Sequence, residues 1–277
     1  MPRAGSRLSR MTAMPIITEK SDPAVQRILD VTKHSRVNIK SVLIEDLEPI
    51  SHCVRAGVDF IEIYATAEAA ELDDIVAITA SREIPLRLMD SAVVNHVFKA
   101  ERKPKIFGIA RVPRACGFAD TEQNPGDLIV LDGVKIVGNI GAIIRTSYAL
   151  GVSGIVLIDS DLTSIADRRL IRASRGYVFS LPIILADRAD AAKYISGNGM
   201  PLVVFDADGA DTLVDLDRID ERIALLFGGE KTGPSSDLYG MRNISVRIPM
   251  RSSAESLNVS VAAGIALYQR SGHSFSR

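Results

Sequence analysis

Three stretches of this 277-residue sequence combine glycine with polar side chains directly after an apolar run that is typical of a β-strand. They are LDGVKIVGNIGAIIRT (131–146), LFGGEKTGPSS (226–236) and IPMRSSAESLNVSVAAGIAL (248–267). Ligands of open parallel sheets bind beyond the carboxyl ends of the strands. We therefore expect the chemistry of the protein at these three strand ends.

The first stretch has part of a nucleotide-binding pattern. Gly133 and Gly138 have the spacing of a phosphate-binding loop, but Asn139 and Ile140 follow where such a loop needs Lys and then Ser or Thr. The segment GNIGAI also lacks the GxGxxG of a dinucleotide turn. The stretch therefore argues against an ATP or dinucleotide site.

Each of the other two stretches, taken alone, has an ordinary structural explanation. Gly228, Gly229 and Gly233 permit a tight turn after a strand. Ser253 or Ser256 is a suitable N-cap for a C-terminal helix. Only the combination of the three stretches points to a specific site.

In order and spacing, the three stretches together resemble the motifs of the SpoU-type branch of the SPOUT RNA methyltransferases. The matching residues are Asp132, Asn139, Gly141 and Arg145 in the first motif, Phe227, Gly228, Glu230 and Gly233 in the second, and Ile248, Pro249, Met250, Ser256, Leu257, Asn258, Val259, Ser260 and Gly264 in the third. Segments 98–113 and 159–182 look like the thiopeptide-resistance rRNA methyltransferases of antibiotic-producing actinomycetes. Gly133-Val134-Lys135, where many relatives have a residue followed by Asp-Pro, favours that subgroup.

The resemblance implies a homodimeric, S-adenosylmethionine-dependent enzyme. Its expected reaction is methylation of the ribose 2′-hydroxyl of an adenosine in the GTPase-associated centre of 23S rRNA, which blocks thiopeptide antibiotics. It also implies a C-terminal trefoil knot whose backbone and apolar walls hold the cofactor; the residues concerned are Phe205, Gly228, Gly229, Ile248, Met250 and Leu257. Two alternatives stay open: a SpoU-type enzyme acting on another rRNA or tRNA ribose, and an rRNA-binding protein that has lost catalysis.

The same resemblance implies that Arg145 is the central catalytic residue. Because a guanidinium stays protonated in proteins, a role as general base is unsuitable for it. We expect it instead to lower the pKa of the hydroxyl and to hold a phosphate or the developing alkoxide. Four further residues are expected to orient Arg145 or the ribose: Asn139, Glu230, Ser256 and Asn258.

The elements that position these residues follow from hydrophobic patterning. Continuously apolar segments at 128–132, 154–159, 181–185, 202–207, 223–228 and 244–249 alternate with helical segments at 139–150, 164–174, 187–196 and 256–270. Strands that are apolar on both faces are typical of a parallel sheet covered by helices. The fold class is therefore α/β, with a parallel-sheet domain at 127–277.

A smaller mixed α/β domain precedes it, and the resemblance makes this the RNA-recognition domain. Helices are expected at 24–33, 48–57, 71–82 and 91–99, and strands at 41–46, 59–64, 85–90 and 106–112. The predicted organisation is a disordered tail at 1–14, the RNA-binding domain at 15–112, a linker rich in Pro and Gly at 113–126, and the methyltransferase domain.

RNA contact requires local positive charge, because 33 Lys and Arg balance 34 Asp and Glu over the whole chain. Residues 95–114 contain six basic residues and one acid, and Arg168, Arg172 and Arg175 have a spacing that places them on one helix face. Such stripes suit phosphates, although a solvated helix face is an alternative. The RNA-binding residues that we predict are Arg36, Phe98, Arg102, Lys105, Arg168 and Arg175. A stacking and a buried Phe98 are equally compatible with the sequence.

Several classes of protein are excluded. No apolar run approaches the ~20 residues of a membrane span. The two cysteines, Cys53 and Cys116, form no CxxC, and with four scattered histidines they have no zinc-site spacing. We therefore expect a cytoplasmic protein in a reducing compartment, with no metal and no membrane partner.

Overall fold

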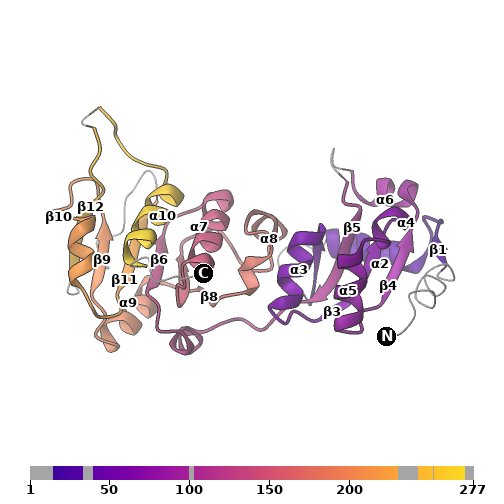
Figure 1. Ribbon diagram of the computed structural model, residues 1–277, viewed down its shortest axis with the longest axis horizontal. Coiled ribbons are helices and arrows are strands. Elements are labelled where there is room, and N and C mark those ends of the chain that lie inside the picture. Colours follow the sequence, from indigo (N-terminus) through magenta and orange to yellow (C-terminus); the bar gives the residue numbers. More distant parts are fainter. Residues whose placement is uncertain (1–14, 34–39, 100–102, 230–242, 252, 272–277) are drawn as a thin grey trace. The chain divides into compact units, whose positions relative to one another are not determined.

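The computed structural model describes residues 15–33, 40–99, 103–229, 243–251 and 253–271. The chain divides between Pro113 and Arg114 into two compact units (Figure 1). The predicted tail at 1–14 lies outside the described residues.

The first unit is built on a mixed five-stranded sheet of order β1-β4-β3-β5-β2. β1, β4 and β3 run parallel, whereas β5 is antiparallel to both β3 and β2. Its elements are β1 (Ile16–Ile17), α2 (Pro23–Lys33), β2 (Ser41–Glu45), α3 (Leu47–Arg55), β3 (Phe60–Ala65), α4 (Ala67–Ala70), α5 (Asp73–Ser81), β4 (Leu86–Met89), α6 (Ser91–Val97) and β5 (Ile106–Arg111). The mixed α/β prediction is confirmed, with β1 and α4 as additions.

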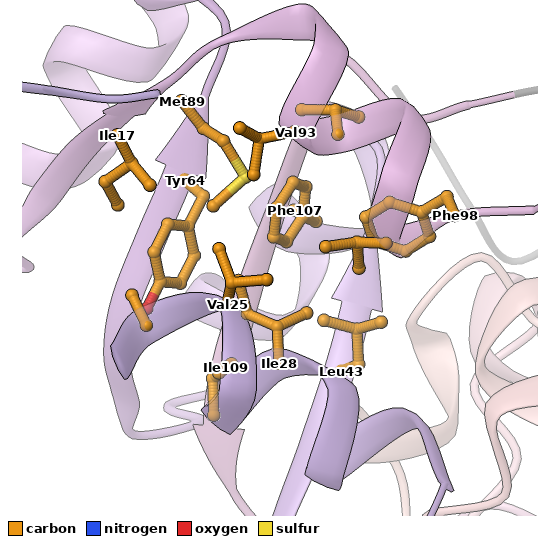
Figure 2. Close-up of a cluster of buried hydrophobic side chains, with 13 residues drawn as sticks. Ile17, Val25, Ile28, Leu43, Tyr64, Met89, Val93, Phe98, Phe107 and Ile109 are labelled. Atoms are coloured by element: carbon orange, nitrogen blue, oxygen red, sulfur yellow. The ribbon is translucent and has the colours of Figure 1, made fainter. Parts of the chain in front are cut away.

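Helices α2 and α6 close one face of this sheet. Figure 2 shows Val25 and Ile28 of α2 directed at a cluster that includes Phe107 and Phe98. The Phe98 ring is 3% exposed and meets Phe107 edge-on, with 4.9 Å between ring centroids. Phe98 is therefore a core residue, and the prediction that it stacks on an RNA base is wrong, because α6 ends beside the sheet and turns the ring inward.

The second unit contains a seven-stranded sheet of order β10-β12-β9-β11-β6-β7-β8, in which every described strand pair is parallel. Its elements are β6 (Leu128–Asp132), α7 (Val137–Ala149), β7 (Gly154–Ile158), α8 (Arg168–Ala173), β8 (Ile183–Leu185), α9 (Arg188–Gly197), β9 (Leu202–Phe205), β10 (Asp211–Thr212), β11 (Ala224–Gly228), β12 (Asn243–Arg247) and α10 (Val259–Arg270). The parallel sheet is thus confirmed, and β10 is an added edge strand.

Both faces of the central strands are covered, as continuous apolar runs require. Alternate residues such as Val130, Val204 and Leu226 form one core cluster with Ala191 and Ile195 of α9. Their neighbours along the strands point to the opposite face. Helices α7 and α10 pack against one another in the same unit (Figure 1).

Residues 114–126 belong to the second unit and are not the linker that the sequence suggests. A 3₁₀ turn (Phe118–Gln123) lies within them, and Thr121 is fully buried. The Thr121 hydroxyl is 2.9 Å from the Tyr194 hydroxyl, and its carbonyl accepts a hydrogen bond from Arg222 at 3.1 Å. Phe118 stacks on Tyr194 with 4.6 Å between centroids. The turn residues of this segment therefore fold against the sheet.

Within the described part of the chain, no helix is both long and apolar enough to cross a bilayer, and no cluster of potential metal ligands occurs. The chain between β11 and β12 falls in 230–242, outside the described residues. The trefoil knot therefore stays a prediction.

Candidate functional site

A cavity of about 210 Å³ opens at the carboxyl ends of β9, β11 and β12. The residues that line it include all six predicted cofactor-binding residues, which are Phe205, Gly228, Gly229, Ile248, Met250 and Leu257. Ser256 lines it as well, whereas Asn139, Arg145 and Asn258 are not among the described residues of its wall. The sheet thus brings together segments more than 40 residues apart in sequence.

The wall of the cavity is largely apolar. The rings of Phe205 and Phe227 stack with centroids 4.6 Å apart and an interplanar angle of 11°. Ile248, Met250 and Leu257 are only partly buried, although their side chains are apolar. Partly exposed apolar side chains around a concave surface, with a few polar groups, are typical of a small-molecule site.

Two asparagines join the first and third motifs at the helix N-termini. Asn258 is the N-cap of α10, because its Oδ1 accepts hydrogen bonds from the amide of Ser260 at 2.8 Å and from its hydroxyl at 2.6 Å. Its Nδ2 donates to Oδ1 of Asn139, at 3.1 Å. The N-cap expected at Ser253 or Ser256 is wrong, since the helix begins only at Val259.

Arg145 lies on the exposed side of α7, about one and a half turns beyond Asn139. Among the described residues, no hydrogen bond or ion pair engages its guanidinium. A permanently charged donor group is therefore presented to solvent on the helix whose N-terminus is tied to the cavity segment.

Gly141 explains why the first motif needs a residue without a side chain. A Cβ at this position would lie 2.6 Å from the carbonyl carbon of Ala173 and 2.8 Å from the amide nitrogen of Ser174. Helices α7 and α8 therefore cross in close contact at Gly141. The crossing carries the end of α8 onto the flank of α7.

The carboxylate of Asp132, at the end of β6, is buried in an ion pair that the sequence did not reveal. Asp132 is 1% exposed, and Arg188 contacts both of its oxygens, with Nη2 at 2.8 Å and Nε at 3.3 Å. The carbonyl of Asp132 accepts a hydrogen bond from the amide of Gly229, at 2.9 Å. Asp132 thus connects the end of β6 to α9 through Arg188 and to one wall of the cavity through Gly229.

The basic stripe expected on one helix is only partly present. Arg168 and Arg172 lie on α8, which ends at Ala173. Arg175 has a left-handed backbone with φ 51°, so it lies beyond the helix and cannot share its face by periodicity. In the first unit, Lys105 is exposed and its ammonium lies 2.9 Å from Glu68.

Three predicted site residues, Arg36, Arg102 and Glu230, lie outside the described residues. Conversely, Phe227 and Asp206 line the cavity but were not predicted as binding residues. The signal for Asp206 was its position directly after the strand at 202–205, where a ligand-binding carboxylate is expected in a parallel sheet. No local signal distinguished Arg188, whose partner Asp132 is 56 residues away.

Two family models match the chain. That of the SpoU rRNA methylase family matches residues 127–268, and that of the thiostrepton-resistance methylase N terminus matches residues 14–124. Together they cover nearly all of the sequence.

Similar proteins of known name extend over almost the same length. A 23S rRNA (adenosine(1067)-2′-O)-methyltransferase of Streptomyces laurentii is 57% identical, covering 96% of this chain and 99% of the relative. The protein of the same name from Streptomyces azureus is 56% identical, covering 94% of this chain and 97% of the relative. Among solved structures, an AdoMet-bound rRNA methyltransferase from Sinorhizobium meliloti aligns with a TM-score of 0.78 and 25% identity, covering 95% of this chain and 99% of that one.

Proposed function

Because the chain belongs to the SpoU rRNA methylase family, we propose that it transfers the methyl group of S-adenosylmethionine to the ribose 2′-hydroxyl of an adenosine in 23S rRNA. The target is the adenosine equivalent to 1067 in the names of the Streptomyces relatives, and the product confers resistance to thiopeptide antibiotics. The methylation takes place in the cytoplasm, which contains the ribosomes.

The observation that carries this proposal is the 57% identity over nearly the full length of both chains. It includes the N-terminal unit, which the model of the thiostrepton-resistance methylase N terminus matches at residues 14–124. A different rRNA or tRNA target is disfavoured for that reason.

The cavity suits S-adenosylmethionine, which supplies an activated methyl group when it is bound. The Phe205–Phe227 pair and the side chains of Ile248, Met250 and Leu257 offer an apolar surface for the adenine and the methionine stem. The glycine backbone at 228–229 offers hydrogen-bonding groups without the obstruction of a side chain. Asp206 is placed to accept hydrogen bonds from the ribose hydroxyls of the cofactor.

Catalysis requires that the ribose 2′-oxygen be aligned with the methyl group of the cofactor and that its proton be removed. Arg145 lowers the pKa of the hydroxyl and holds the phosphate or the developing alkoxide. The Asn258–Asn139 hydrogen bond keeps the start of α7 beside the cavity, and Ser256 and Glu230 orient the ribose. Arg168, Arg175 and Lys105 bind phosphates of the RNA, together with Arg36 and Arg102.

The protein acts as a homodimer whose interface includes α10. Val261, Ile265 and Tyr268 recur at i, i+4 and i+7 on this helix and are 49%, 36% and 56% exposed. A stripe of large apolar side chains on a surface helix suits a second copy. In sedimentation velocity we expect Ile265→Glu to produce a monomer, and an unchanged sedimentation coefficient would refute this interface.

The reaction is tested with purified protein, radiolabelled S-adenosylmethionine and an rRNA fragment of the GTPase-associated centre. We expect label in the natural fragment and none in a fragment with 2′-deoxyadenosine at the target. Label in both would identify another acceptor. Label in neither, beside an active control enzyme, would refute the proposal and direct attention to tRNA or to RNA binding alone.

Arg145→Ala tests the catalytic assignment. We expect cofactor affinity, measured by isothermal titration, to survive while transfer falls by a factor of about 10² or more, the usual cost of removing one charge-stabilising donor. Arg218→Ala is a matched control, because Arg218 is an exposed arginine that pairs with Asp215 at 3.0 Å and is not among the residues that line the cavity. Equal activity of the two variants would remove Arg145 from the mechanism.

A further inference from the structure

A pair of tyrosines lies beside Arg145, and none of the roles above uses it. The rings of Tyr148 and Tyr177 have centroids 4.6 Å apart and are tilted by 35°. Tyr148 is nevertheless 48% exposed. Since the Tyr177 ring lies against the Tyr148 ring, we infer that the exposed surface of Tyr148 includes the side of the ring that faces away from Tyr177.

The backbone holds this pair in place from two sides. Tyr148 is on α7, three positions after Arg145, so the two side chains are neighbours on the helix and about 4.5 Å apart along its axis. Tyr177 follows Arg175 and Gly176, both of which have left-handed backbones, with φ 51° and 83°. The amide of Gly176 closes the turn on the carbonyl of Ile171, at 2.9 Å.

An arginine in the left-handed region is strained compared with glycine. The turn therefore has a conformational strain energy at Arg175, and its geometry places both Arg175 and Tyr177 at the flank of α7. The close helix crossing at Gly141 is what brings this turn to the tyrosine of the neighbouring helix.

We propose that the exposed face of Tyr148, backed by Tyr177, stacks on the base of the target adenosine. This inference rests on the proposed function. A methyltransferase can reach a 2′-hydroxyl only in a nucleotide that is accessible, and single-stranded RNA is recognised by stacking its bases on aromatic rings. The one-turn separation from Arg145 is comparable with the separation of a ribose from its own base.

The surroundings favour a nucleotide over a protein partner at this position. Each tyrosine has an arginine two or three positions before it, Arg175 and Arg145, and both cations are exposed. The apolar stripe of α10 is on the other flank of α7, where Gly264 meets Thr146. An exposed aromatic ring held by two segments that each carry an exposed arginine suits a base and its phosphates.

The test is a double cycle of protein and RNA changes. Affinity is measured for wild type, Tyr148→Leu and Tyr148→Phe, each with the rRNA fragment carrying adenosine or an abasic ribose at the target. Loss of one stacked base weakens binding by about 5- to 150-fold. We expect Tyr148→Leu to lose affinity by this factor for the RNA with adenosine and to lose none for the abasic RNA. The affinity of Tyr148→Phe for both RNAs should stay within about twofold of wild type.

Three other results would overturn the inference: no loss in Tyr148→Leu, an equal loss on both RNAs, or a changed sedimentation coefficient, which would assign the ring to a subunit interface. Cofactor affinity, measured in parallel, shows that the variant is folded. Methyl transfer by wild type on the same adenosine RNA separates the two proposals. No transfer refutes the proposed function and the stacking together, whereas transfer with unchanged affinity in Tyr148→Leu refutes the stacking alone.

Discussion

Replacing Gly141 by alanine is the sharpest perturbation of the site that leaves every polar group in place. The new Cβ would be 2.6 Å from a carbonyl carbon and 2.8 Å from an amide nitrogen of α8 and its cap. These are main-chain atoms, so no rotamer change relieves the contact, and α8 must move away from α7.

Two contributions of opposite sign determine how much Gly141→Ala changes the free energy of unfolding. Overpacking a close helix contact costs about 1–3 kcal/mol, and a backbone obstacle belongs to the upper part of that range. Alanine in place of glycine within a helix returns at most about 1 kcal/mol. We therefore expect Gly141→Ala to lower the free energy of unfolding by about 1–2 kcal/mol, which corresponds to about 2–8 °C in Tm for a unit of this size.

The same helix supplies the matched control. A Cβ at Gly138 would meet no heavy atom within 4 Å. Gly138→Ala should therefore raise stability, by a few tenths up to about 1 kcal/mol. Urea unfolding followed by far-UV circular dichroism compares the two variants. If Gly141→Ala were as stable as Gly138→Ala, the close crossing of α7 and α8 would be refuted.

Three further predictions concern titratable groups. Arg188→Ala removes the guanidinium that contacts both oxygens of the buried Asp132 carboxylate and should destabilise the protein by up to about 3–5 kcal/mol in urea unfolding; unchanged stability would contradict the pairing. The Arg114 guanidinium holds the pKa of Asp120 at about 2, below the usual value for aspartate. The ionised carboxylate therefore stabilises the folded state fully above the usual aspartate pKa, and this contribution is lost as the pH falls toward 2. An NMR titration should show this pKa rising in Arg114→Gln, and an unchanged value would exclude the pairing as its cause. Burial raises the pKa of the Cys53 thiol to about 12, so a disulfide reagent at pH 8 should modify it only after unfolding; rapid reaction in the native state would show that the thiol is accessible.

Hydrophobic patterning predicted most of the regular elements, because most strands have several consecutive apolar residues and are more apolar than the segments beside them. The segment at 128–132 is buried along its whole length, which leaves a clear signal in the sequence. β1 and β10 have two residues each and were missed, since two residues carry no period. The end of α8 was missed because charge spacing does not report the left-handed turn at Arg175.

The motifs predicted the cavity better than the groups that hold it in shape. Ile248, Met250 and Leu257 are close in sequence and line the cavity together. In contrast, Asp132 and Arg188 meet across 56 residues. Pairs so far apart leave no pattern in a single sequence, because only the fold brings them together.

The anchoring of residues 114–126 determines which piece of this protein can be moved as a unit. Thr121 accepts a hydrogen bond from Arg222 across 101 residues, and Tyr194 loses both its stacking and its hydroxyl partner if the segment is removed. A methyltransferase domain cut at 127 would therefore expose apolar surface and leave the partly buried guanidinium of Arg222 with the Ser153 hydroxyl but without Thr121. Recombination between enzymes of this kind preserves both halves only if the crossover falls at Pro113. The N-terminal unit available for exchange, in evolution or in a designed chimera, thus ends at Pro113, before the segment that the sequence suggests as a linker.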